Sequence, residues 1–307
     1  MNFLAKPISA FRNSLSGTKI DFMRFHKIAL IMSVIAIIAS IVLVIFRGLN
    51  FGIDFAGGIL IEVRIKEQVD ISEMRKAITE VVKDAQIQNV DQQDYLIRVA
   101  KSSQDQTVII KNIQNLLQSK YSDVEYRKLD YVGPQVGREL IFKGIMALLL
   151  SFIFIMIYIW VRFDWQFGIG GIFALIHDAF LTLGFFAVTQ LEFNLTSIAS
   201  ILTIIGYSIN DSVVIYDRIR ENLSRYKKSN LSELINSSTN STLSRTILTA
   251  SATLVSLLAL IFYGGEVLFS FSMATFFGII IGTYSSIYIS APILLYFDPR
   301  LKNKNKS

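Results

Sequence analysis

The sequence predicts a polytopic α-helical membrane protein with six transmembrane helices and a small α+β domain between the first and second. Of its 307 residues, 52% are hydrophobic, a larger share than a soluble domain of this length usually has. These residues gather in runs of about 20, the length that crosses ~30 Å of hydrocarbon. A single long stretch of mixed polarity, residues 47–140, follows the first run. Six spans and one inserted domain therefore account for the chain.

The first apolar run, residues 28–46, follows a basic segment, residues 1–27. The run is longer than a signal-peptide core, and Ile45, Phe46 and Arg47 offer no small-x-small cleavage site. We therefore expect an uncleaved membrane anchor.

The inserted stretch, residues 47–140, predicts strands and helices in the order β-α-β-α-β. Its expected elements are strands at 59–65, 95–101 and 124–132, and helices at 72–83, capped by Ser72, and 108–117. This order is typical of a ferredoxin-like α+β sandwich.

Five further apolar runs follow the domain. They cover residues 141–161, 167–189, 195–216, 246–263 and 267–297. The last run is longer than one span requires, and we expect Pro292 to perturb its final turns.

The net charge of +6 is explained by topology. Lysine and arginine gather in residues 1–27, at Arg162, in the loop 217–245 and in the tail 298–307, and six spans place all of these on one side. The positive-inside rule then puts both termini and that loop in the cytoplasm, and the inserted domain on the periplasmic side. A nucleic-acid partner is accordingly not expected.

An acid lies within the fourth span, where an unpartnered charge is costly. Polar residues recur on one face of this span: Ser200, Thr203, Tyr207, Asn210 and Asp211. The fifth span carries a similar stripe: Arg245, Thr249, Thr253 and Ser256. Two antiparallel helices would bring the stripes together, so that Arg245 holds Asp211 ionised and protonation of Asp211 releases the pair. The alternative is a static ion pair or plain interhelical hydrogen bonding.

A second candidate, His177-Asp178, lies near the middle of the third span. The pair would relay protons, because histidine titrates near neutral pH, or would lock the helix to a neighbour.

The remaining sequence patterns indicate close helix packing or argue against enzymatic, metal-binding and cofactor-binding functions. Gly278 and Gly282 form a GxxxG pair, which permits close helix packing. The sequence has no phosphate-binding loop, metal-ligand cluster or Ser-His-Asp set, and no cysteine. We therefore expect no enzyme activity, no metal site and no cofactor.

In its ordered motifs the chain resembles the SecF branch of the SecD/SecF family, membrane subunits of the bacterial Sec protein translocase that are similar to RND-superfamily transporters. Besides Ile176-His177-Asp178 and the segments around Asp211 and Arg245, the motif residues are Gly52, Asp54, Gly57, Gly58, Gly133, Pro134, Gly137, Asp217 and Arg218. The resemblance implies a protein of the bacterial inner membrane that works with SecD and the SecYEG channel. It also implies that the protein assists preprotein export with the proton motive force, and that Asp211 and Arg245 occupy the positions implicated in proton flow.

Two other functions stay open from the residues alone. One is an RND-like secondary transporter of small molecules or lipids, although six spans make only half of such a transporter's core. The other is a non-catalytic scaffold subunit in the lipid membrane, in which Asp211 and Arg245 are purely structural.

Overall fold

The structure, a computed structural model, describes residues 19–67, 69–82, 85–89, 93–99 and 106–300. Parts of the predicted basic N-terminal segment and of the tail lie outside these residues. The chain divides into two compact units. The membrane unit comprises the described residues of Met1–Asn50, Ala147–Leu191 and Thr196–Ser307, and the sheet unit comprises those of Phe51–Met146 and Glu192–Leu195. Each unit is described separately below.

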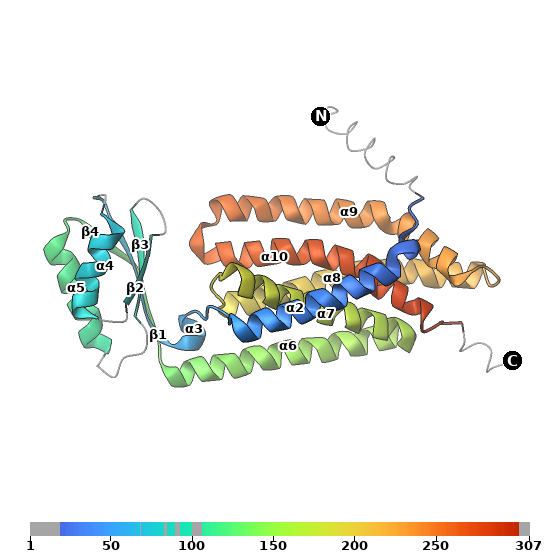
Figure 1. The fold of residues 1–307 in the computed structure, drawn as a ribbon, viewed down its shortest axis with the longest axis horizontal. Coiled ribbons are helices and arrows are strands. Elements are labelled where there is room, and N and C mark those ends of the chain that lie inside the picture. The colour runs from blue at the N-terminus through green and yellow to red at the C-terminus, as the bar shows by residue number, and fades with distance from the viewer. Residues whose placement is uncertain (1–18, 68, 83–84, 90–92, 100–105, 301–307) are drawn as a thin grey trace, which may run out of the picture. The chain divides into compact units, whose positions relative to one another are not determined.

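The sheet unit has the predicted ferredoxin-like fold (Figure 1). Its elements are α3 (Ile53–Ala56), β1 (Gly58–Ile65), α4 (Ile71–Val81), β2 (Ala85–Asn89), β3 (Asp94–Val99), α5 (Gln106–Lys120) and β4 (Val124–Val132). The four strands pair in the order β2-β3-β1-β4, and every neighbouring pair is antiparallel. From β1 onward the chain follows the β-α-β-β-α-β pattern of that fold.

Two local predictions in this unit were wrong. The strand β2 was not predicted, because it is short and only Ala85 and Ile87 pack into the core between polar neighbours. The cap of α4 is Asp70 and not Ser72, since the Asp70 side chain accepts a hydrogen bond from the Ser72 amide at 2.8 Å.

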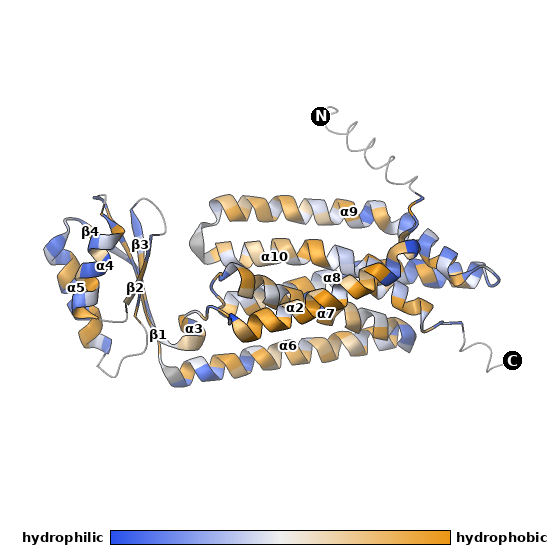
Figure 2. Ribbon diagram, viewed as in Figure 1, coloured by the Kyte–Doolittle hydropathy of each residue, from blue (hydrophilic) through white to orange (hydrophobic). Residues whose placement is uncertain are grey.

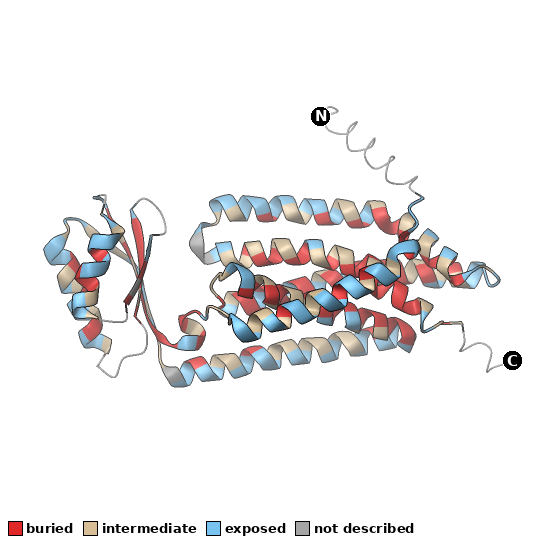
Figure 3. Ribbon diagram, in the orientation of Figure 1, coloured by how far each residue is buried: buried red, intermediate tan, exposed pale blue. Residues whose placement is uncertain are grey.

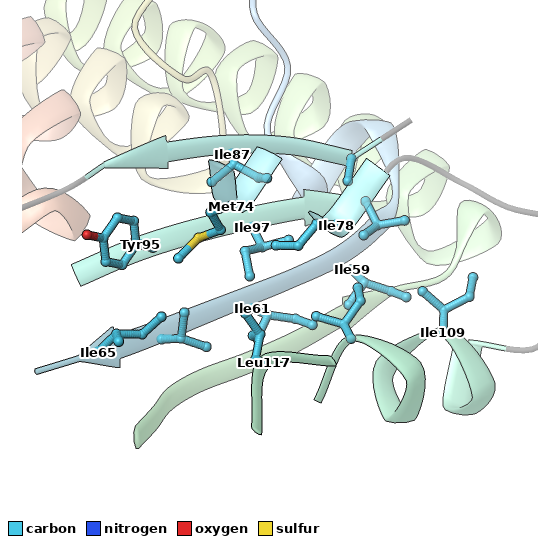
Figure 4. Packing of buried hydrophobic residues seen from close by; sticks show 14 residues of the cluster. Ile59, Ile61, Ile65, Met74, Ile78, Ile87, Tyr95, Ile97, Ile109 and Leu117 are labelled. Carbon is cyan, nitrogen blue, oxygen red and sulfur yellow. The ribbon is translucent and has the colours of Figure 1, made fainter. Parts of the chain in front are cut away.

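The core of the sheet unit follows from side-chain periodicity. Alternate residues of β1 point to one face of the sheet, where they meet the apolar stripes of α4 and α5. Figure 4 shows Ile59, Ile61 and Ile65 from β1 packed with Met74 and Ile78 from α4. A dry core of branched side chains therefore holds the two helices on the sheet.

The membrane unit contains the helical part of the fold. Its elements are η1 (Phe22–Phe25), α2 (His26–Phe46), α7 (Trp165–Thr189), α8 (Leu195–Arg225), α9 (Leu231–Tyr263), α10 (Gly265–Ser285), η2 (Ser286–Ser290), η3 (Pro292–Leu295) and the second half of α6 (Pro134–Arg162). Among the described residues six helices are long and apolar enough to cross a membrane, as predicted. Figure 2 shows hydrophobic residues along α2, α6 and α10.

Close packing in this unit depends on small residues as well as on buried apolar side chains. A Cβ atom added at Gly184 of α7 would lie 2.2 Å from Ser40 Oγ of α2. One added at Gly278 of α10 would lie 2.2 Å from a side-chain carbon of Ile204 of α8. Most residues of α2 and α6 are exposed in the chain alone (Figure 3). Their apolar side chains suit contact with lipid. Because lipid tails are themselves apolar, the hydrophobic effect does not favour burying these side chains between helices.

The segment 217–245, expected as a cytoplasmic loop, is mostly helical. Helix α8 continues to Arg225 and α9 begins at Leu231, after an Asn230 cap. Asn222 donates a hydrogen bond to the buried Ser238 hydroxyl at 2.8 Å, which joins the two helices. The basic residues of this segment predicted a loop, but several of its Ser, Thr and Asn residues are buried between packed helices.

The last span is irregular near Pro292, as predicted. The α-helix α10 ends at Ser285 and is followed by a π-helical turn, η2, and then by the 3₁₀ turn η3, which begins at Pro292. Proline cannot donate the backbone hydrogen bond that a continuing α-helix requires.

Candidate functional site

Asp211 is buried in the membrane unit, and among the described residues its side chain is hydrogen-bonded only to hydroxyl groups. Thr246 of α9 donates to its Oδ1 at 2.5 Å, and Ser286 of η2 donates to its Oδ2 at 2.5 Å. The residue is 7% exposed. Each carboxyl oxygen therefore has one hydroxyl donor, from a different helix.

The expected ion pair between Asp211 and Arg245 is absent from the described residues. Arg245 is exposed, and none of the salt bridges within 4.0 Å includes it. It interacts with Asp211 only electrostatically, at longer range. Thr246, the next residue along α9, makes the short-range contact instead.

The two polar stripes of α8 and α9 do face each other in part. The Tyr207 hydroxyl interacts with Thr249 and Thr253 of α9. Asn210, by contrast, is exposed on α8. Of the predicted candidates, the structure thus places Tyr207, Asp211 and Thr249 along one contact between the helices, and leaves Asn210 and Arg245 on the surface.

Asp178 lies in a second buried polar cluster. It is 0% exposed, and His177 is 1% exposed. His177 Nδ1 lies 2.9 Å from Asp178 Oδ1, so adjacent side chains on one helix do meet. Ser208 of α8 and Ser285 of α10 both donate to Asp178 Oδ2, at 2.6 and 2.7 Å. The predicted pair is therefore also locked to two neighbouring helices.

Two consecutive serines connect these clusters. Ser285 donates to Asp178, and Ser286 donates to Asp211. Sequence reasoning missed both, together with Ser208 and Thr246. A serine in an apolar helix usually bonds to its own backbone, so its presence carried little signal.

Asp217 and Arg218 belong to a separate, half-exposed network. Asp217 Oδ1 accepts hydrogen bonds from Arg162 Nη2 at 2.9 Å and from Arg220 Nη2 at 3.3 Å. Arg218 donates to Ser241 and Glu221 at 3.1 and 2.6 Å. These contacts join the end of α6 to α8 and α9, which indicates a structural role.

The motif residues 52–58 form a tight turn in the sheet unit. Gly57 and Gly58 have φ values of 72° and 132°, which non-glycine residues rarely adopt, and they join α3 directly to β1. A Cβ atom at Gly137 would lie 3.0 Å from the Phe55 carbonyl oxygen, so α6 approaches this turn closely. Gly133 packs beside Tyr131, and Pro134 begins α6.

The same turn binds the segment Glu192–Leu195 within the sheet unit. Asp54 Oδ2 accepts the Leu195 amide hydrogen bond at 3.0 Å, and the Gly52 amide donates to the Phe193 carbonyl at 2.9 Å. Arg98 of β3 forms an ion pair with Glu192. Burial raises the pKa of the Glu192 carboxyl, and Arg98 opposes that rise.

Comparisons with known proteins identify the family to which these motifs belong. Residues 112–300 match the family described as "Protein export membrane protein SecD/SecF, C-terminal". The chain belongs to the SecD/SecF family. Residues 42–69, which include the Gly57-Gly58 turn, match the SecD/SecF GG motif.

Curated relatives from Rickettsia cover nearly the whole chain. The "Protein translocase subunit SecF" of Rickettsia felis is 53% identical over 290 residues, which is 92% of this chain and 94% of the relative. The protein of the same name from Rickettsia bellii is 54% identical over 283 residues, which is 90% of this chain and 93% of the relative.

Solved structures share the fold of this SecD/SecF chain. SecDF from Thermus thermophilus, a translocon-associated membrane protein, has a TM-score of 0.83 at 35% identity; the match covers 93% of this chain. SecDF in a super-membrane-facing form has a TM-score of 0.67 at 33% identity over 94% of this chain. The chain spans 39% and 40% of these two longer proteins.

Proposed function

We propose that this chain is the SecF-type subunit of a bacterial protein translocase, and that it assists preprotein movement across the inner membrane by using the proton motive force. The SecF name of the Rickettsia relatives and their identity of about half over almost the full length support the translocase role. The positive-inside distribution of lysine and arginine supports cytoplasmic termini and a periplasmic sheet unit.

The proposal that this protein handles protons rests on the environment of Asp211. A buried carboxylate in hydrocarbon is costly unless a cation compensates it. The described residues place no cationic group within 4.0 Å of Asp211, and its two close partners are neutral hydroxyls. Hydroxyls donate to a carboxylate and accept from a carboxylic acid, so this arrangement tolerates both protonation states.

The energy available from one proton is sufficient for a conformational change. A proton that crosses 100 mV yields about 2.3 kcal/mol, which shifts a two-state equilibrium by a factor of tens. In the proposal, protonation of Asp211 changes the packing of α8 against α9 and η2. Arg245 then serves as the longer-range counter-charge of the ionised state.

A polar strip on the membrane unit supports a SecD-type partner. The exposed residues of this strip on α8 and α9 are Thr203, Asn210, Arg245, Thr249 and Ser256. Polar groups at membrane depth need a protein or water neighbour rather than lipid. The chain also covers 39% of the SecDF protein that it resembles, so a SecD-type half would supply that neighbour. The SecYEG channel and the exported preprotein complete the proposed assembly.

The test is Asp211→Asn in the full chain, reconstituted with its SecD-type partner and the channel. We expect the complex to assemble normally. The proton-driven stimulation of preprotein export should fall at least about tenfold, because an increase of about 1.4 kcal/mol in the activation free energy slows a step tenfold. The matched control is Asp123→Asn, which removes an exposed carboxylate in the sheet unit and should leave export unchanged.

Normal stimulation in Asp211→Asn would refute the role of this acid. Co-purification of the chain with neither a SecD-type protein nor the channel would instead favour a free-standing transporter. Proton flux that is the same in Asp211→Asn and in the unchanged chain would favour a scaffold subunit.

A further inference from the structure

Among the described residues, the two buried acids of the membrane unit make no hydrogen bond to each other, but two of their hydrogen-bond donors are neighbours in the chain. Ser285 is the last residue of α10, and Ser286 is the first residue of the π turn η2. Ser285 donates to Asp178 Oδ2 at 2.7 Å, and Ser286 donates to Asp211 Oδ2 at 2.5 Å. Both serines are fully buried.

Each of the two serine hydroxyls has one proton and at least two acceptors, and Ser285 Oγ also lies 3.4 Å from Ser208 Oγ. Ser286 Oγ lies 2.5 Å from Asp211 Oδ2 and 3.0 Å from the Thr283 carbonyl oxygen. Ser285 Oγ lies 2.7 Å from Asp178 Oδ2 and 3.1 Å from the Gly282 carbonyl oxygen. A hydroxyl can donate fully to only one of them at a time. Each serine therefore has a second acceptor already in place, on its own helix.

Protonation of an acid changes which acceptor its serine uses. An ionised Asp211 accepts the Ser286 hydrogen, whereas Asp211 protonated on Oδ2 offers a hydrogen of its own to Ser286. The Ser286 hydroxyl then accepts from Asp211 and donates to the Thr283 carbonyl. Serine bonds to the carbonyl one turn earlier bend helices, and this bond would form where the α-helix meets the π turn.

Because of the position of the π turn, that bend also changes the hydrogen bonding of Asp178. Because Ser285 and Ser286 share a peptide bond, a change of backbone geometry at Ser286 moves the Ser285 hydroxyl, which lies within 2.7 Å of Asp178. The hydroxyl of Thr283 is buried with no partner among the described residues, as is that of Ser212. Hydrogen-bonding capacity is thus available for a second arrangement.

We propose that Ser285 and Ser286 are positioning residues that couple the protonation of Asp211 to the hydrogen bonding of Asp178. The inference rests on the proposed function, in that Asp211 is the group that takes up the proton. By linkage, protonation of Asp211 and the hydrogen bonding of Asp178 affect each other by the same coupling free energy, so the loss of a Ser285 contact to Asp178 should change the titration of Asp211.

The titratable groups near the two acids define the other routes by which Asp211 and Asp178 could be coupled. Near Asp178 these are His177 on its own helix and Tyr284 of α10, whose ring lies 6.0 Å from the His177 ring. Near Asp211 they are Tyr207 on α8 and Arg245 on α9. From α2, the hydroxyl of the neutral Ser33 lies 3.2 Å from the Tyr284 hydroxyl. A direct electrostatic effect between the acids is the principal alternative, and the experiment separates it.

The decisive variant is Ser285→Ala, which removes a donor from Asp178 and none from Asp211. Ser208→Ala is the control, because Ser208 donates to the same Asp178 oxygen at 2.6 Å from α8; the 3.4 Å contact between the Ser208 and Ser285 hydroxyls is lost in both variants. The titration of Asp211 is followed by the carboxyl band in infrared spectra of the full chain in bilayers with its SecD-type partner. Its band is assigned by its loss in Asp211→Asn.

We expect Ser285→Ala to shift the Asp211 titration midpoint by about one pH unit, the scale of strongly interacting sites. Ser208→Ala should shift it by less than half as much. In a Ser286→Ala background, adding Ser285→Ala should produce no further shift, because the connection is already broken. Ser290→Ala, in the same turn but bonded to Tyr216, controls for general damage to η2.

Three results would overturn the coupling: equal shifts in Ser285→Ala and Ser208→Ala, an undiminished shift in the Ser286→Ala background, or no shift at all. Equal shifts would indicate an electrostatic effect through Asp178 alone. If Ser285→Ala fails to fold, the same comparison is made in the Ser286→Ala chain, with and without Ser208→Ala. If Ser208→Ala still shifts the titration midpoint of Asp211 in that chain, the result would count against the proposal. Export that depends on Asp211, together with an Asp211 titration that does not respond to Ser285→Ala, would refute the coupling and leave the proposed function intact.

Discussion

The two units bury a carboxylate in opposite ways. In the sheet unit, Asp94 is 5% exposed and accepts hydrogen bonds from Arg64 Nε and Nη2, both at 2.7 Å, and from Arg127 at 3.3 Å. The hydrogen bond from Arg64 holds the pKa of Asp94 below its ordinary value, more than burial raises it. In the membrane unit, Asp211 has only hydroxyl donors within hydrogen-bonding distance in the described part of the chain.

The difference lies in what each set of donors can do. A guanidinium only donates, so Asp94 is satisfied in one protonation state and stays ionised. A hydroxyl donates or accepts, so Asp211 is satisfied in two. The packing of the units differs in parallel: branched apolar side chains fill the sheet unit, whereas glycine and serine bring the membrane helices together. The buried acid of the sheet unit is therefore stabilised in one protonation state, and the buried acid Asp211 of the membrane unit in two.

The largest effect is expected from filling a close contact in the membrane unit. Gly184→Val would place side-chain atoms where Ser40 of α2 lies, with the Ser40 Cα only 3.1 Å from an added Cβ. We expect a loss of about 3 kcal/mol in stability, because the backbone itself must move. Thermal unfolding of the purified chain measures it.

Gly206→Ala on α8 is the control for Gly184→Val, since an added Cβ there meets nothing within 4 Å. It should be neutral or stabilise by up to about 1 kcal/mol, because alanine favours a helix. Ser40→Gly should rescue part of the loss in Gly184→Val. Equal behaviour of the two glycine variants would show that close packing of α2 on α7 is unimportant.

An intermediate effect is expected for Asp94→Asn in the sheet unit. Because the pKa of Asp94 is lowered on folding, its stabilisation is complete above the ordinary value of 3.8 and disappears as pH falls through the lower folded-state pKa. Arg64 and Arg127 are about one third exposed, so we expect about 1–2 kcal/mol at neutral pH, less than for a fully buried pair.

The measurement for Asp94 is amide hydrogen exchange of β1 in the full chain, for the unchanged protein and the variant across this pH window. The difference between the two should be largest at neutral pH and vanish in acid. A difference independent of pH would mean that the lost contact is not electrostatic.

The smallest effect on stability is expected for Asp211→Leu, although Asp211 is the residue on which export should depend most. After the substitution Ser286 can donate to the Thr283 carbonyl at 3.0 Å, and a helical threonine such as Thr246 can bond to its own backbone. We expect less than about 1 kcal/mol, measured by thermal unfolding. A loss as large as that of Asp94→Asn would show that Asp211 is a structural residue like Asp94.

The sequence allowed prediction of the spans, the inserted fold and the two acids, because apolar runs and intramembrane charges are strong signals. Asp211 and Asp178 stand out against apolar neighbours, and both prove to be buried in polar clusters. Their donors could not be predicted, because a serine at 285 or 286 looks like any other small residue of a membrane helix. The predicted ion pair failed for a related reason: periodicity places Arg245 near Asp211 along the helices but does not fix which side chain faces inward.

The hydrogen bond between Asp54 and the Leu195 amide has a practical consequence for dissecting this protein. An excised fragment with the predicted limits, residues 47–140, would contain every strand but would lack the segment Glu192–Leu195. It would leave Arg98 without Glu192 and would uncover Phe55, which packs on Phe193 with ring centres 5.8 Å apart. A soluble version of the domain must therefore carry this distant tetrapeptide, for example joined by a linker or supplied as a separate peptide.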